Sequence, residues 1–185
     1  MRDFIEAKWR EHIHLFQVLP SLFEGMEDLA GRLGEVLGRG GKVLVFGNGG
    51  SAASAQHFAS ELVGRLVKED ALHYPALALT TDSFLLTALA NDFGYREVFS
   101  RQIEVLGRKG DMALGITTSG RSPNVLKALE VAKEMGLVTV GLTGGDGLAL
   151  KVDLEVRVPS HDTPRIQEAH DFILHTVAAA VKLSS

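Results

Sequence analysis

His57 and Glu61 have the residue types and the spacing of an acid–base pair. They lie four residues apart in a segment rich in helix formers, so a helix would place an imidazole and a carboxylate on one face. Helix geometry separates the Cβ atoms of such a pair by about 6 Å, close enough for both side chains to act on one bound molecule. The sequence therefore predicts proton-transfer chemistry beside this helix.

Residues 165–183 are predicted to form a long closing helix with several polar side chains. These are Gln167, Glu168, His170, Asp171 and His175. Gln167, Asp171 and His175 recur every four residues and therefore share one side of the helix. Any one of the five alone is more typical of a solvated helix face, and a lone histidine beside apolar residues, as at His175, is usually a hydrogen-bonded core residue. Four further histidines are predicted to lie on the surface, namely His12, His14, His73 and His161.

A glycine turn joins a predicted strand at residues 42–46 to the helix that carries His57. The turn reads GNGGS and consists of Gly47, Asn48, Gly49, Gly50 and Ser51. Glycines let a ligand approach the backbone, and the free N–H groups at a helix start favour an anion. The turn also has a purely structural interpretation. Its spacing matches neither the dinucleotide fingerprint nor the Walker loop, which argues against a nucleotide.

A second turn, TTSGRS, carries four hydroxyl groups within six residues. They belong to Thr117, Thr118, Ser119 and Ser122. The turn precedes a predicted helix at residues 123–135, with Ser122 as its cap and Pro123 at its first position. One hydroxyl there is typical of simple capping, whereas four together indicate a donor-rich pocket for a phosphate monoester.

The order of predicted elements indicates an α/β fold. Apolar runs predict strands at residues 42–46, 76–79, 111–116, 137–142 and 152–158, separated by helices at 51–65, 82–91, 95–106 and 123–135. This alternation predicts a doubly wound, mostly parallel five-stranded sheet, with ligands at the carboxyl ends of the strands and the alternating last strand at an edge.

We expect a single domain over residues 1–185, with a helical pair in 1–40 and an α/β core in 41–185. The helical pair carries apolar residues at helical spacing within 4–16 and 22–37. It could cover its own core or pack against another copy in an oligomer, and the sequence leaves both interpretations open.

Composition excludes several classes of function. The chain has 185 residues, a formal net charge of −4 and no cysteine, and it contains no basic run that would favour nucleic acid. The charged N-terminal segment is unlike a signal peptide, and no apolar run approaches the length of a membrane span. We therefore predict a cytoplasmic protein without a nucleic-acid or membrane partner.

Five segments together resemble the sugar isomerase domain and, within it, the phosphoheptose isomerase family. They are GNGGSAASAQHFASELVGR, ANDFG, GITTSGRSPNV, LTGGDG and RIQEAH followed by His175. The resemblance implies conversion of sedoheptulose 7-phosphate to glycero-manno-heptose 7-phosphate for lipopolysaccharide or other surface glycans. It also implies a cytoplasmic homotetramer with active sites between subunits.

The resemblance also implies roles for individual residues. Thr117, Thr118, Ser119 and Ser122 would bind the phosphate, whereas the sugar chain would contact Asn48, Gly49, Gly50, Ser51, Asn91 and Asp92. Glu61 and His175 would be the catalytic base and acid, with Glu61 and Gln167 also touching substrate. Zinc would be held by His57, Glu61, Gln167 and His175, although Gln167 and His175 lie about 12 Å apart along one helix.

A non-catalytic alternative comes from the same fold. Some bacteria carry a sugar-isomerase-domain adaptor that binds the replication initiator DnaA, and the segments ALTTDSFLLTALANDF and PSHDTPRIQEAH are similar to it as well. The adaptor lacks counterparts of Glu61 and His175, which this chain keeps. The sequence therefore favours the enzyme.

Overall fold

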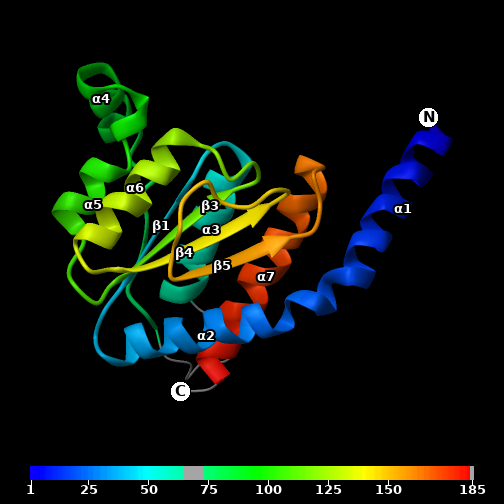
Figure 1. The fold of residues 1–185 in the computed structure, drawn as a ribbon, viewed down its shortest axis with the longest axis horizontal. Helices are drawn as coiled ribbons and strands as arrows, with labels where there is room; N and C mark the ends of the chain where they lie inside the picture. The colour runs from blue at the N-terminus through cyan, green and yellow to red at the C-terminus, as the bar shows by residue number, and fades with distance from the viewer. Residues whose placement is uncertain (65–72, 184–185) are drawn as a thin grey trace.

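A five-stranded, all-parallel sheet forms the centre of the computed structural model, which describes residues 1–64 and 73–183 (Figure 1). The strand order is β2-β1-β3-β4-β5, so β5 lies at an edge as the sequence predicted. The strands are β1 (Val43–Gly47), β2 (Ala76–Ala78), β3 (Met112–Thr117), β4 (Val138–Gly144) and β5 (Leu154–Val158). The predicted doubly wound α/β fold is confirmed.

Helices cover both faces of the sheet, because successive strand residues point to opposite sides. Val43 and Val45 belong to the core on one face, and Leu44 and Phe46 to the core on the other. The first core is completed by α2 (Phe23–Gly38), α3 (Gly50–Val63) and α7 (Thr163–Leu183). The second is completed by α5 (Ser100–Leu106) and α6 (Pro123–Glu134).

The helix predicted at residues 95–106 is wrong as a single element. The chain instead forms a short 3-10 turn, η2 (Tyr95–Glu97), followed by α5. The Ser100 hydroxyl donates to the Glu97 carboxylate over 2.7 Å, and such local side-chain bonds compete with a continuous helix.

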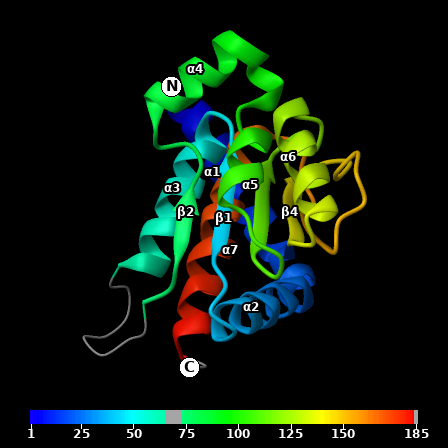
Figure 2. The same cartoon turned by 90° about the vertical axis from the view of Figure 1, so that its left-hand side faces the viewer.

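Helix α4 (Ser83–Phe93) projects from the body of the molecule, as Figures 1 and 2 both show. It is apolar in sequence, yet none of its residues is buried. Phe84 is 83% exposed. Leu86, Leu89 and Ala90 pack partly buried against the second core, so the apolar surface left uncovered is on the outer side of the helix, where Phe84 lies.

The two N-terminal helices differ in how they pack. In α2, Leu29 and Leu33 are completely buried in the first core. Helix α1 (Arg2–Val18) buries only Leu15 and reaches past the sheet, joined to α2 by the 3-10 turn η1 (Leu19–Leu22) (Figure 1). Phe4 and Trp9 on α1 are more than 60% exposed. Helix α2 thus covers its own core, whereas α1 leaves an apolar face uncovered.

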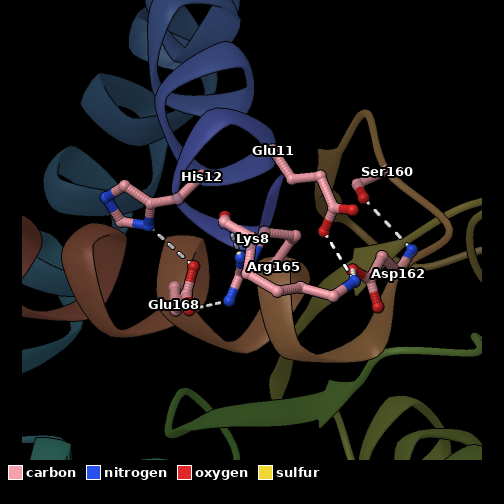
Figure 3. A network of polar contacts seen from close by, with 7 residues as sticks. All are labelled: Lys8, Glu11, His12, Ser160, Asp162, Arg165 and Glu168. Carbon is pink, nitrogen blue, oxygen red and sulfur yellow. Dashed lines mark hydrogen bonds and ion pairs between the residues drawn. The ribbon is translucent and has the colours of Figure 1, made fainter. Parts of the chain in front are cut away.

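A polar network fixes α1 to the start of α7 (Figure 3). The Arg165 guanidinium donates to the Lys8 carbonyl oxygen over 2.6 Å and also pairs with Glu168. The other Glu168 oxygen lies 2.8 Å from His12 Nδ1. His12, predicted to lie on the surface, is instead partly buried beside Glu168, whereas His14, His73 and His161 are exposed as predicted.

No helix among the described residues is long and apolar enough to cross a membrane.

Candidate active site

The GNGGS turn follows the carboxyl end of β1 and starts α3, as predicted. Gly49 precedes the helix with φ of 55°, a backbone conformation that glycine adopts without strain. Gly50 is needed for a different reason, because a Cβ there would overlap the Gln167 side chain. The two glycines therefore bring the start of α3 against the amide of Gln167 on α7.

Asn48 in this turn is bound to the neighbouring strand–helix connection. Asn48 and the buried Asn124 exchange two amide hydrogen bonds, each 2.8 Å long. The Tyr95 hydroxyl also donates to Asn48 Oδ1 over 3.1 Å. Sequence reasoning did not identify Asn124 or Tyr95. The only sequence signal for Asn124 was its place directly after the hydroxyl-rich turn.

The hydroxyl groups of the TTSGRS turn converge where β3 ends. Thr117 Oγ1 lies 3.0 Å from Ser122 Oγ and 3.4 Å from Ser119 Oγ. Thr118 and Ser119 line a cavity of about 240 Å³. Ser122 precedes α6 as predicted, but its hydroxyl does not cap the helix, because it turns back toward Thr117. The hydroxyl groups thus gather between the end of β3 and the start of α6, where they offer several hydrogen-bond donors.

Asn91 and Asp92 lie at the end of α4 and are exposed. The Asn91 side chain donates to Asp92 Oδ1 over 2.8 Å. They lie just before η2, whose Tyr95 contacts Asn48 of the GNGGS turn.

Glu61 lies between two histidines from different helices. Its Oε1 atom is 3.1 Å from His57 Nε2, one turn earlier on α3, and 3.0 Å from His175 Nδ1 on α7. Glu61 is 7% exposed, whereas the two imidazoles are about half exposed. The structure therefore joins the predicted His57–Glu61 pair to His175, which is a member of this exposed cluster and not a core histidine.

The cluster has the donor set of a transition-metal site. One ligand atom from each of the three side chains can be chosen so that all lie within 4.8 Å of one another. Glu61 Oε2 is buried and has no hydrogen-bond partner in the described part of the chain, so a polar atom of the cluster is left unsatisfied there. Two imidazoles and a carboxylate suit zinc. The fourth expected ligand, Gln167, lies two helical turns earlier, against Gly50.

The prediction that the polar residues of α7 lie on a solvated face is wrong for His170. It is completely buried, and its Nε2 lies 3.0 Å from the Thr143 carbonyl oxygen. Burial lowers its pKa to about 4, so the ring is neutral at physiological pH and donates Nε2–H to that carbonyl. His170 is thus the core histidine of this helix, and it ties α7 to β4.

Comparisons with known proteins agree with this architecture. The profile of the SIS domain matches residues 12–144. A phosphoheptose isomerase from Geobacter metallireducens is 49% identical over 185 residues, covering 98% of this chain and 97% of the relative.

Two solved structures are similar over almost their whole length. A phosphoheptose isomerase from Francisella tularensis has a TM-score of 0.93 at 36% identity and covers 98% of this chain and 97% of its own. One from Neisseria gonorrhoeae has a TM-score of 0.91 at 39% identity, with 97% of each chain covered. Fold and sequence profile thus define an SIS-domain protein. Within that class, this chain belongs to the phosphoheptose isomerase family of enzymes, which confirms the resemblance.

Proposed function

We propose that this protein interconverts sedoheptulose 7-phosphate and D-glycero-D-manno-heptose 7-phosphate through an enediol. The observation that carries the proposal is the buried Glu61 carboxylate held between His57 and His175. Aldose–ketose isomerisation moves a proton between adjacent carbons and a second proton between their oxygens, so it needs a base and an acid side by side. The cluster supplies both.

The two proton transfers can be assigned to residues of the cluster. As Glu61 takes a proton from C1 of the ketose, His175 donates a proton to O2, and the enediol forms. Glu61 then returns the proton to C2 while His175 takes the proton from the O1 hydroxyl as the C1 carbonyl forms, so the aldose results with no change in the number of atoms or electrons. A half-exposed imidazole suits this task, because it can exchange protons with both substrate and solvent.

The TTSGRS turn would bind the phosphate of the substrate. Thr117, Thr118, Ser119 and Ser122 offer donors at the start of α6, where backbone N–H groups also favour an anion. The carbon chain would then run along Asn48, Gly49, Gly50 and Ser51, with Asn91, Asp92 and Gln167 as further substrate contacts.

Zinc fits the cluster and is proposed as the cofactor. His57, Glu61 and His175 would hold it, with Gln167 as the fourth ligand if its side chain turns along α7. When bound, zinc would stabilise negative charge that develops on the substrate oxygens. The unsatisfied Glu61 Oε2 supports this assignment.

A homotetramer with active sites between subunits is the proposed assembly. Glu61 lies eleven residues beyond Gly50, about 16 Å along the helix axis, so the base is far from the turn that starts α3. A neighbouring subunit would shorten that gap by placing its own turns near Glu61. The exposed apolar face of α1 offers a contact for such a neighbour. We place the enzyme in the cytoplasm, supplying heptose for lipopolysaccharide or surface glycans.

Turnover of sedoheptulose 7-phosphate by the purified protein tests the proposal directly. We expect wild-type turnover and a loss of kcat of about 100-fold or more in Glu61→Gln and in His175→Ala, because each removes a proton-transfer group. Chelation should lower activity, and added zinc should restore it. Equal turnover in all three proteins would refute the assignment, and tight DnaA binding without turnover would favour the adaptor.

A further inference from the structure

Helices α3 and α7 meet along the active site in three successive contacts. Gly50 meets Gln167, Ser54 meets Asp171, and Glu61 meets His175. Gly50 and Ser54 are four residues apart, as are Gln167, Asp171 and His175, so the two helices run in the same direction and present one turn after another to each other. Figures 1 and 2 both show α3 and α7 side by side.

The middle contact is a direct hydrogen bond between side chains of the two helices. Ser54 Oγ donates to Asp171 Oδ1 over 2.6 Å, whereas the carbonyl oxygen of Gly50 lies farther from the same hydroxyl, at 3.3 Å. A hydroxyl has one proton, so the shorter, charge-assisted bond to the carboxylate takes it. Ser54 is 6% exposed, whereas Asp171 is exposed, so the bond joins a buried hydroxyl to a carboxylate at the surface.

Apolar packing between these helices combines small and large side chains. Ser51 and Ala55 on α3 are small, whereas Phe58 and Leu62 are large and completely buried in the core that α7 shares. Near Ser54 the small side chains form shallow ridges, so a polar pair there can add to the packing that fixes the register of the two helices. A shift of α7 along α3 would move His175 relative to Glu61, because the two side chains belong to different helices.

We propose that Ser54 and Asp171 are positioning residues that hold His175 at the Glu61 carboxylate. Among the described residues, no hydrogen bond or ion pair joins either of them to the cluster, so they would act through the register of the two helices. The expected effect of the Ser54–Asp171 pair on turnover rests on the proposed isomerase function. The expected effect of the pair on the position of His175 does not depend on that function.

Paired substitutions separate the hydrogen bond from simple packing. Ser54→Ala and Asp171→Ala should each lower kcat about 10-fold or more with KM within about twofold, because misplacing a catalytic group costs rate more than substrate binding. Asp171→Asn keeps an oxygen that can accept from Ser54 and should retain most of kcat. The Ser54→Ala/Asp171→Ala double variant should be no worse than either single variant.

Ser60→Ala is the matched control. Ser60 lies on the same helix, but its hydroxyl donates within that helix, to the His57 carbonyl oxygen. This variant should keep wild-type kcat. Additive losses in the double variant, or an equal loss in Asp171→Asn and Asp171→Ala, would overturn the inference.

A readout without substrate keeps the inference distinct from the proposed function. Nitrogen-15 NMR of the histidine rings reports the hydrogen bond between His175 Nδ1 and Glu61. We expect the His175 signal to move in Ser54→Ala and Asp171→Ala but not in Ser60→Ala, provided that all three proteins show wild-type circular dichroism. An unchanged His175 signal would refute the positioning role, whereas a moved signal in a protein without turnover would refute only the isomerase assignment.

Discussion

Individual side chains on α7 have opposite roles although their residue types are the same. His175 is half exposed and contacts Glu61, whereas His170, five residues earlier, is completely buried against the Thr143 carbonyl. The helix turns by 100° per residue, so five residues place the two rings on different sides. One histidine is therefore available for proton transfer, and the other is part of the core.

Burial of His170 predicts an acid-sensitive stability. Its pKa of about 4 in the folded protein lies below the ordinary histidine value of 6.5, so the unfolded chain binds the proton more readily. The stabilisation by neutral His170 is complete above about pH 6.5 and is lost as the pH falls toward 4. Urea unfolding at pH 7 and pH 5 should show a loss of about 2 kcal/mol that His170→Gln lacks.

The comparison with His170→Gln isolates this one group, because every other titrating side chain is common to both proteins. Glutamine can still donate to the Thr143 carbonyl but does not titrate. Identical pH dependence in the two proteins would contradict the assignment of the shift to His170.

At the scale of elements, the site depends on how closely the start of α3 approaches α7. Gly50 has no side chain, and the space that a Cβ would take is filled by the Gln167 amide. The same approach brings the GNGGS turn and α7 to one place. The GNGGS turn follows β1, and the TTSGRS turn follows β3. The Asn48–Asn124 amide pair joins the first turn to the start of the helix that follows the second.

Gly50→Ala should displace Gln167 while leaving the fold intact, since Gly50 has an ordinary helical backbone that alanine tolerates. We expect isomerase KM to rise about 10-fold, because a contact to substrate is misplaced. Steady-state kinetics would measure this.

Gly34→Ala on α2 is the matched control, because a Cβ there would meet nothing within 4 Å. It should keep wild-type kinetics and gain up to about 1 kcal/mol of stability from the higher helix propensity of alanine. Unaltered KM in Gly50→Ala would show that Gln167 does not contribute to binding.

At the scale of the whole molecule, the apolar side chains that remain uncovered gather on the outer faces of two helices, α1 and α4. Phe4, Ile5 and Trp9 on α1 are all at least 60% exposed, and Phe84 on α4 is 83% exposed. The polar network of Lys8, His12, Arg165 and Glu168 nevertheless fixes the direction of α1 (Figure 3). A helix that is fixed in place but apolar on its outer face is typical of a subunit contact.

Trp9→Glu should weaken the proposed tetramer, because association would bury a charge in place of an indole. Sedimentation velocity at micromolar concentration should show smaller species, and activity should fall with them if the sites lie between subunits. Ala7→Glu, on the opposite side of α1, is the control and should leave assembly unchanged. A tetramer in both variants, or a monomer in wild type, would contradict the prediction.

The sequence by itself determined the fold class and the positions of the turns. Alternating apolar runs and helix-forming segments are local patterns, and they identified all five strands and the order of the helices. The sequence also predicted the acid–base pair on α3, because residues four apart on a helix, such as His57 and Glu61, lie on the same face. Local spacing failed where a serine hydroxyl has a partner that the spacing does not show. Ser100 bonds to Glu97 at the start of α5, and the Ser122 hydroxyl turns to Thr117 and does not cap α6.

Tertiary structure alone decided which distant residues meet. Periodicity around a helix gives faces but not partners, so it could not tell that His170 is buried and His175 exposed, or that His12 pairs with Glu168. Nor could it predict the Ser54–Asp171 bond, because its two residues are 117 positions apart and neither resembles a catalytic group. Such contacts depend on how α3 and α7 pack on the sheet, which is a property of the whole fold.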